Sequence, residues 1–219
     1  NDLTGSTQYV GNWPGVTVEK KEGRYKADKE IRITDLPGIY SLSPYTLEEV
    51  ITRDFLVNEK PDVIVNLVDA SNIERNLYLT TQLLEMGIPV VVALNMMDIV
   101  SKRGDTIDVK KLSAELGVPV VETTALKGKG TRELMEAGRK ASGARPAKHE
   151  FSDEIENALS QITDLIRDVT EEGQRRWFAV KLFERDEKVL ARFHFSQDVR
   201  GKLEKIITAV EDELDDDAE

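Results

Sequence analysis

Three short polar stretches combine residue types and spacings that suit the binding of phosphate, Mg²⁺ and a nucleobase. The first is Asp35-Leu36-Pro37-Gly38, which ends the alternating strand pattern of residues 31–34. An Asp at the end of a strand can hold Mg²⁺ through water, and the N–H of a glycine three residues later can meet a terminal phosphate. An ordinary strand-to-turn junction has the same residue types, so this motif alone does not decide between ligand binding and a turn.

The second and third stretches each follow a run of apolar residues. Asn95-Met96-Met97-Asp98 comes directly after residues 90–94, and Thr124-Ala125-Leu126-Lys127 comes directly after residues 118–123. A carboxylate such as that of Asp98 can accept hydrogen bonds from both the ring N–H and the amino group of guanine, a pair of donors that adenine does not offer on that edge. We expect Asn95 to tie the loop and to reach the other side of the base, and the backbone N–H of Ala125 to bind the carbonyl oxygen of the base.

A fourth element is Thr17, which follows Gly15 at a boundary between loop and strand. A hydroxyl there can ligate Mg²⁺ when a γ-phosphate is present and release it when the phosphate leaves, as in switch GTPases. Each element alone is a weak signal, because Asn-x-x-Asp also occurs in turns and helix caps. Three motifs in order, each at the carboxyl end of a predicted strand, together indicate a guanine-nucleotide site.

The elements that must position these motifs alternate between strand and helix. Residues 16–21 and 31–35 predict an antiparallel hairpin, preceded by a loop at 6–15 and by the last turn of a helix closed by glycine at 1–5. Apolar runs typical of strands covered on both faces lie at 63–68, 89–94 and 118–123, and helical spacing is found at 47–57, 73–86, 109–116 and 131–141. This alternation predicts right-handed βαβ units and a mostly parallel α/β sheet, whose ligands bind beyond the carboxyl ends of the strands.

Beyond a linker at 142–148 the pattern is purely helical. Ser152 and Ser196 are suited to cap two helices, whose apolar stripes are Ile155, Leu159, Ile162, Ile166 and Val169 in the first, and Val199, Leu203, Ile206, Ile207, Val210 and Leu214 in the second. Residues 176–184 are apolar nearly all round and are expected at the centre of a small bundle. We therefore expect an α/β domain at 1–144 and a small all-α domain at 145–219.

Composition and charge narrow the class of protein. The chain has 219 residues, no Cys and a net charge of −11. Residues 1–149 hold 20 Lys/Arg and 21 Asp/Glu, whereas residues 150–219 hold 10 and 20, so nearly all of the excess negative charge lies in the helical part. This argues against a nucleic-acid partner, which requires a basic surface. No apolar run approaches the ~20 residues that span a bilayer.

The motifs together resemble the cytosolic N-terminal G domain of the FeoB family of ferrous iron transporters. The resemblance rests on residues 11–19 (Gly-Asn-Trp-Pro-Gly-Val-Thr-Val-Glu), 35–42, 74–79 and 95–98, and it extends to residues 176–184, which are similar to the helical domain of that family. The loop Asn-Trp-Pro-Gly-Val-Thr is not a general GTPase feature. The resemblance implies a Ras-like, P-loop GTPase fold followed by a helical domain that influences GDP retention.

The resemblance also implies roles for individual residues. Switch I is Gly15, Val16, Thr17, Val18 and Glu19, and the Mg²⁺ and γ-phosphate motif is Asp35, Leu36, Pro37 and Gly38. The guanine-reading residues are Asn95, Met96, Met97 and Asp98, and the base is backed by Thr124, Ala125 and Leu126. The implied ligands are GTP or GDP and Mg²⁺, with Thr17 and Asp35 as the metal ligands.

The whole protein that the resemblance implies is a membrane transporter. Its partner would be a membrane permease domain of the same polypeptide, at the cytoplasmic face of a prokaryotic inner membrane, and the G domain would regulate Fe²⁺ uptake. A homo-oligomer is compatible with this arrangement.

Two departures from the usual GTPase pattern affect catalysis. Ile39 stands where Ras-like proteins carry the Gln that orients the attacking water, so no catalytic residue is identified and hydrolysis is expected to be slow; a monovalent cation such as K⁺ is one candidate for assistance. No Gly-x₄-Gly-Lys-Ser/Thr sequence is present. We expect roughly 20 further residues, a strand, a P-loop and a helix, before Asn1, and impaired triphosphate binding by the chain as given.

A smaller departure is Met96, which replaces the Lys that most GTPases have there; its thioether can cover the plane of the base as a Lys stem would. Two other functions remain open at this point. An Era-like soluble GTPase should carry a basic appended domain, and here that domain is acidic. A nucleotide-dead G domain that docks a partner protein would bind no GTP.

Overall fold

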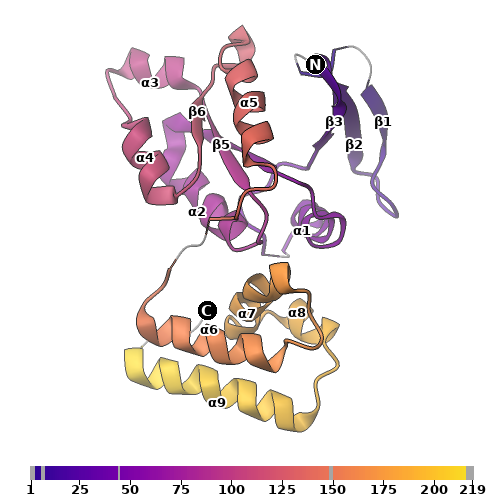
Figure 1. Cartoon of the computed structure of the whole chain (residues 1–219), viewed down its shortest axis with the longest axis vertical. Coiled ribbons are helices and arrows are strands. Elements are labelled where there is room, and N and C mark those ends of the chain that lie inside the picture. The colour runs from indigo at the N-terminus through magenta and orange to yellow at the C-terminus, as the bar shows by residue number, and fades with distance from the viewer. Residues whose placement is uncertain (1–2, 6–7, 44, 148–149, 216–219) are drawn as a thin grey trace. The chain divides into compact units, whose positions relative to one another are not determined.

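The computed structural model describes residues 3–5, 8–43, 45–147 and 150–215. It divides into two compact units (Figure 1): one comprises residues 1–83 and 89–145, and the other comprises residues 84–88 and 146–219. The short segment 84–88 therefore groups with the helical part, although it lies within the predicted α/β domain. No helix among the described residues is long and apolar enough to cross a membrane.

The first unit begins with an antiparallel sheet in the order β1 (Gln8–Asn12), β2 (Glu19–Tyr25) and β3 (Asp28–Asp35). The predicted hairpin is confirmed, but the prediction of a loop at 6–15 is wrong at β1, and β2 starts three residues later than expected. The reason is a closed loop at 13–18, in which Trp13 N–H donates to Val18 O (2.9 Å) and Val16 N–H to Trp13 O (3.2 Å). These bonds take residues 16–18 out of the ladder.

A second sheet holds three parallel strands, β4 (Ile64–Asp69), β5 (Val90–Asn95) and β6 (Val120–Glu122), in that order. The parallel pairing confirms the βαβ prediction. All of Val90 to Leu94 is buried, as a strand covered on both faces requires. Strand β4 differs from its prediction, because Val65 and Leu67 on one face remain 40% and 61% exposed. Among the described residues no backbone pairing joins β3 to β4, so the two sheets are separate.

Helices surround these strands close to their predicted positions. Helix α1 (Leu47–Glu59) starts with a reciprocal cap between Thr46 and Glu49. The chain continues through η1 (Ala70–Asn72), α2 (Ile73–Leu84), α3 (Met97–Arg103), α4 (Val109–Leu116), η2 (Ala125–Lys127) and α5 (Thr131–Ala141). Helix α5 packs on β5 through a cluster of Val91, Ala93, Leu134 and Ala141.

The second unit is all-helical, as predicted, with α6 (Asp153–Leu165), η3 (Glu172–Gln174), α7 (Arg175–Phe183), α8 (Glu187–Arg192) and α9 (Gln197–Leu214). All seven residues from Trp177 to Phe183 are buried, which confirms the central position expected for them. Ser196 caps α9 by accepting from the Val199 N–H, whereas Ser152 makes no such bond. The predicted stripes end early, because Val169 lies beyond α6 and is 59% exposed, and Leu214 is 42% exposed.

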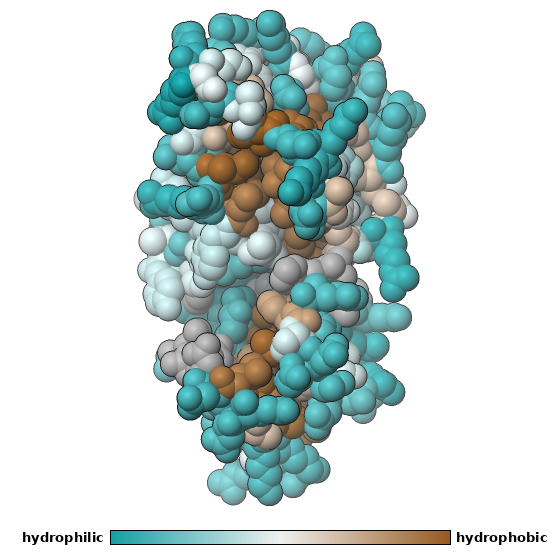
Figure 2. Space-filling view, turned by 90° about the vertical axis from the view of Figure 1, so that its left-hand side faces the viewer, coloured by the Kyte–Doolittle hydropathy of each residue, from teal (hydrophilic) through white to brown (hydrophobic). Residues whose placement is uncertain are grey.

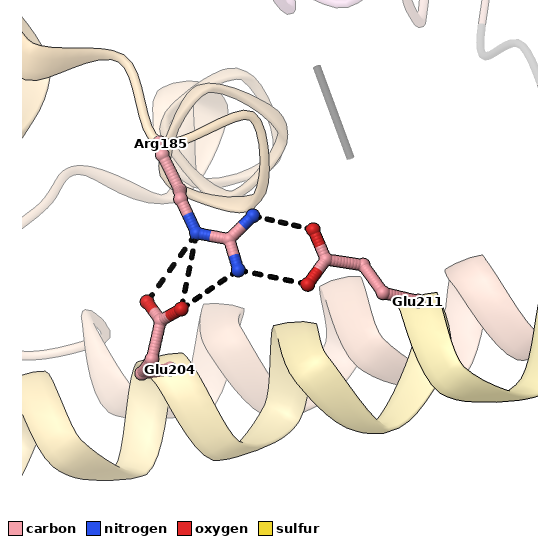
Figure 3. Close-up of polar contacts among 3 residues, drawn as sticks. All are labelled: Arg185, Glu204 and Glu211. Carbon is pink, nitrogen blue, oxygen red and sulfur yellow. Dashed lines mark hydrogen bonds and ion pairs between the residues drawn. The ribbon is translucent and has the colours of Figure 1, made fainter. Parts of the chain in front are cut away.

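An arginine joins the turn between α7 and α8 to α9 (Figure 3). The Arg185 guanidinium donates to the carboxylates of Glu204 and Glu211, at 2.7 Å and 2.8 Å from Nη2. The two glutamates are seven residues apart and therefore lie on one face of α9. Arg185 itself has a φ of +53°, a conformation that costs an L-residue some energy, so the two ion pairs hold this turn in place.

Candidate functional site

The carboxyl ends of β5 and β6 are tied together by one side chain. Asn95, the last residue of β5, accepts hydrogen bonds on Oδ1 from the backbone N–H of Ala125 (3.1 Å) and the hydroxyl of Thr123 (3.4 Å). Thr123 N–H also donates to Leu94 O at 2.8 Å. The second and third sequence motifs thus form one connected structure at a single edge of the sheet.

Asp98 projects from the first turn of α3, a helix that the sequence analysis did not predict. Met96 enables the turn by adopting a left-handed conformation (φ +65°), which is rare for a residue other than glycine. One Asp98 oxygen, Oδ2, accepts from Lys127 Nζ at 2.8 Å. This hydrogen bond, helped by the positive charge of Lys127, lowers the pKa of Asp98 below its ordinary value. Asp98 is therefore an ionised hydrogen-bond acceptor, 29% exposed. It lies three residues after Asn95, whose side chain joins the ends of β5 and β6.

The loop that carries Lys127 is closed on itself. Thr124 O accepts from the backbone N–H groups of Lys127 (2.9 Å) and Lys129 (3.3 Å), and Thr124 and Lys129 form an antiparallel bridge. The Ala125 N–H, which we expected to bind a base carbonyl, donates to Asn95 instead. Within this loop Ala125 and Leu126 are exposed, Leu126 by 92%.

The phosphate-side motifs lie at one end of the β2–β3 ladder. Asp35 ends β3 and is paired with Lys21 of β2. Because β2 starts at Glu19 and β3 ends at Asp35, the segments 15–18 and 36–38 flank the same end of this ladder. Gly15 has a φ of +77°, and Thr17, Asp35 and Gly38 are exposed.

Both segments are anchored to helices of the same unit. Trp13 is buried (6% exposed) and packs edge-on against Phe55 of α1, with ring centroids 5.4 Å apart. Pro37 O accepts from the hydroxyl of Thr52, also on α1, at 3.4 Å. Val16, Val18 and Leu36 are partly buried. The exposed Thr17, Asp35 and Gly38 thus lie in segments whose apolar residues are partly buried.

Further along, residues 39–42 are attached to α2. The Arg75 guanidinium lies over the Tyr40 ring, 3.9 Å from its centroid, and Leu42 N–H donates to Gln82 Oε1 at 2.7 Å. Ile39, which follows Gly38, carries no group that could orient water.

The structure therefore connects some predicted residues and leaves others apart. Asn95, Asp98 and the 124–127 loop are joined by hydrogen bonds. Thr17 and Asp35 share one end of a hairpin, but among the described residues no hydrogen bond or ion pair joins them to each other or to Asp98. The residues that the structure describes also contain no group of three or more His, Cys, Asp and Glu side chains that could hold a metal ion.

Two residues at this edge were not recognised from the sequence. Lys127 was noted only as the end of a motif, and its pairing with Asp98 depends on the loop conformation. Asp69 ends β4 in register with Asn95. Its position after an apolar strand was the available signal, but its carboxylate caps η1 by accepting from Ser71 N–H and Oγ at 2.8 Å and 2.7 Å.

Comparison with known proteins identifies both units. Residues 1–137 match the family model "Ferrous iron transport protein B", and residues 151–219 match the FeoB cytosolic helical domain. A fusion of Fe(2+) transport protein A with the Fe(2+) transporter FeoB from Porphyromonas gingivalis is 45% identical over 200 residues, which cover 86% of this chain and 24% of that protein. The chain thus spans about a quarter of that relative's length.

Solved structures of S. thermophilus NFeoB variants have the same fold. One, bound to GDP, is 47% identical with a TM-score of 0.95, covering 100% of this chain and 86% of that one. Another, bound to GDP and AlF₄⁻, is 47% identical with a TM-score of 0.90, covering 99% and 85%. From its first strand to its last helix, the chain belongs to the ferrous iron transport protein B family, as the N-terminal G domain and the cytosolic helical domain.

Proposed function

We propose that this chain is a guanine-nucleotide switch that hydrolyses GTP slowly and regulates Fe²⁺ uptake. The observation that carries the proposal is the hydrogen-bonded connection between the ends of β5 and β6. Asn95 accepts from the Ala125 N–H, and the same loop reaches the ionised Asp98 through Lys127. Related S. thermophilus proteins were solved with GDP and with GDP and AlF₄⁻, which supports a nucleotide at this position.

At the base end, the carboxylate of Asp98 would accept hydrogen bonds from the ring N–H and the 2-amino group of guanine. Asn95 holds the loop of Ala125 through its Oδ1 atom. Met96 lies between Asn95 and the start of α3 and is partly exposed, so its thioether is available to cover the base. The loop 124–126 would back the base from β6.

At the phosphate end, Thr17 and Asp35 offer a hydroxyl and a carboxylate at one end of the hairpin. These oxygen donors fit Mg²⁺, which takes one or two protein ligands and retains several waters. When bound, Mg²⁺ would neutralise charge on the phosphates. The Gly38 N–H would meet the terminal phosphate, and residues 15–19 would order around it.

The remainder of the phosphate cradle is not among the motifs of these 219 residues. Among the described residues β3 and β4 each have one unpaired edge, and Val65 and Leu67 on β4 are exposed; these surfaces support the packing of a further strand and helix against them. On one face of the first unit, which contains both sheets, apolar side chains come to the surface (Figure 2). Slow hydrolysis follows from Ile39, and K⁺ is a candidate aid in place of a water-orienting side chain.

The link to iron is proposed through the rest of the polypeptide. The P. gingivalis relative is named as an Fe(2+) transporter, so a membrane permease of the same polypeptide, with the G domain on the cytoplasmic side, is the proposed partner. The net charge of −11 supports a partner other than nucleic acid.

The test is the titration of fluorescent GDP into the intact polypeptide that contains this chain. Asp98→Ala should weaken GDP binding by about 10- to 100-fold, the range for a lost hydrogen bond to a charged group. Asp98→Asn should lose GDP affinity but gain affinity for XDP, because an amide can donate to the additional carbonyl of xanthine. If GDP affinity is absent from the wild type or unchanged by both variants, the chain is a docking module and not a nucleotide switch.

A further inference from the structure

We propose that Lys127 is a positioning residue for guanine recognition, holding the Asp98 carboxylate so that both of its oxygens can face the base. This inference rests on the proposed function, since it assumes that Asp98 reads guanine. Two observations support it. Lys127 Nζ forms a 2.8 Å ion pair with Asp98 Oδ2. Each of these two residues lies on a segment whose backbone is held by hydrogen bonds.

The lysine comes from a loop with little freedom. Its backbone N–H and that of Lys129 both bond to Thr124 O, Gly128 turns the chain with a φ of +63°, and the Ala125 amide is bound to Asn95. The carboxylate comes from the first turn of α3, where Val100 N–H donates to Met96 O. The ion pair therefore joins two fixed backbones and restricts the rotation of Asp98.

The pair is compatible with a bound base. An ionised carboxylate has about four acceptor positions on its two oxygens, and Lys127 uses one of them on Oδ2. Three remain, enough for the ring N–H and the amino group of guanine. Lys127 therefore does not need to leave when the nucleotide binds.

The positive charge of Lys127 is also consistent with a role in positioning the Asp98 carboxylate. Met96 lies between Asn95 and Asp98 and carries no charge, so the cation nearest to the recognition carboxylate comes from the other loop. Lys102, one turn further along α3, also acts on Asp98 at longer range. Because Lys127 is 55% exposed, its contribution is limited by solvent screening.

The readout that distinguishes positioning from general stability is the preference for GDP over IDP. Hypoxanthine lacks the 2-amino group, so IDP uses one oxygen of Asp98 where GDP uses both. A carboxylate that rotates more freely loses more of the two-point contact than of the one-point contact. Lys127→Met should therefore lower the GDP-to-IDP affinity ratio.

The experiment compares fluorescent GDP and IDP binding by the intact polypeptide and its variants. Lys127→Met should reduce the affinity ratio by about two- to fivefold, the range for an exposed ion pair, and Lys127→Arg should restore it. The matched control is Lys129→Met, because among the described residues the side chain of Lys129 makes no ion pair. This control should leave the ratio unchanged.

Two outcomes would overturn the inference while leaving the proposed function intact. In both, the wild type prefers GDP and Asp98→Ala removes that preference. In the first, Lys127→Met behaves like Lys129→Met. In the second, Lys127→Met tightens GDP binding, which would mean that Lys127 competes with the base. Failure of the proposed function is separate, since the wild type would then show no preference for GDP.

Discussion

Two aspartates near the carboxyl ends of the parallel strands, Asp69 and Asp98, have different roles. Asp69 is the last residue of β4 and Asp98 lies three residues beyond the end of β5, but the carboxylate of Asp69 accepts from the backbone N–H and the hydroxyl of Ser71. Asp98 makes one ion pair and keeps acceptor capacity. The distinction between a structural and a ligand-binding carboxylate is therefore set by the neighbouring residues and not by position at the strand end.

The role of Asp69 leads to a pH-dependent prediction. Hydrogen bonds, chiefly from the Ser71 hydroxyl, lower the pKa of Asp69 in the folded protein. A carboxylate with a lowered folded-state pKa stabilises the fold above its unfolded pKa of about 3.9, and this stabilisation is lost as pH falls through the folded value. Asp69→Asn should cost about 0.5–1 kcal/mol at neutral pH, allowing for solvent screening of this largely hydrated group.

Urea denaturation of the wild type and Asp69→Asn at a series of pH values measures this difference. It should begin to shrink as pH falls below about 4 and should vanish only below the lowered folded-state pKa of Asp69, where both proteins carry a neutral side chain. Asp105→Asn, at an exposed position, is the control for a simple loss of charge. A difference between wild type and Asp69→Asn that is constant with pH would contradict the assignment.

At the level of elements, the geometry of the base-side loop depends on the junction between β6 and α5. Gly130 directly precedes α5 with a φ of +79°, and a Cβ built on it would lie 2.1 Å from the carbonyl oxygen of Glu122 in β6. Only glycine permits this approach. The close contact sets the distance between the strand and the helix, and with it the closure of residues 124–129.

Substitution at Gly130 should therefore be costly. Gly130→Ala combines a left-handed backbone with a clash against backbone, and we expect about 2–4 kcal/mol of destabilisation together with weaker GDP binding. Gly104→Ala is the matched control, because Gly104 has a similar φ (+81°) but nothing within 4 Å of the added Cβ, so only about 1 kcal/mol is expected. Thermal unfolding and GDP titration measure both; equal effects at the two glycines would show that the Glu122 contact is unimportant.

Sequence patterns alone predicted the helices whose ends are marked by capping or helix-breaking residues. The helices at 109–116 and 131–141 begin and end where predicted: Asp108 caps the start of the first and Gly117 follows its end, and Gly130 precedes the second. Strand β1 was missed because its exposed Tyr9 and Val10 give it no buried face. Helix α3 was missed because its start depends on the left-handed Met96, which no periodicity reveals. Likewise, Asn95 was expected to tie its loop, but its bond to Ala125 is a contact between distant segments.

At the level of the whole molecule, the division into two units does not follow the order of the chain. Helix α2 ends at Leu84, and residues 84–88 belong to the helical unit before the chain returns to β5. Within that unit, Arg176 donates through Nε to Glu85 (2.5 Å) and through its two terminal nitrogens to Glu156 (2.9 and 2.7 Å). The helical unit is thus completed by a segment from the middle of the α/β sequence.

This arrangement makes Arg176 important to the stability of the helical unit. Glu85 has a side chain only 6% exposed, and breaking a buried pair by removing one partner typically costs about 3–5 kcal/mol. Arg176→Met should approach this range. Arg167→Met is the matched control, because Arg167 is 63% exposed in its pair with Asp164, and an effect below about 1 kcal/mol is expected.

The two tryptophans allow each unit to be followed separately, since Trp13 lies in the first and Trp177, 3% exposed, lies in the second. In a Trp13→Phe background, denaturation monitored by Trp177 fluorescence should shift strongly with Arg176→Met and little with Arg167→Met. Adding Glu85→Gln to Arg176→Met should recover part of the loss, because the amide leaves no buried charge. If Arg176→Met and Arg167→Met shift the Trp177 transition equally, residues 84–88 are not required to hold the helical unit together.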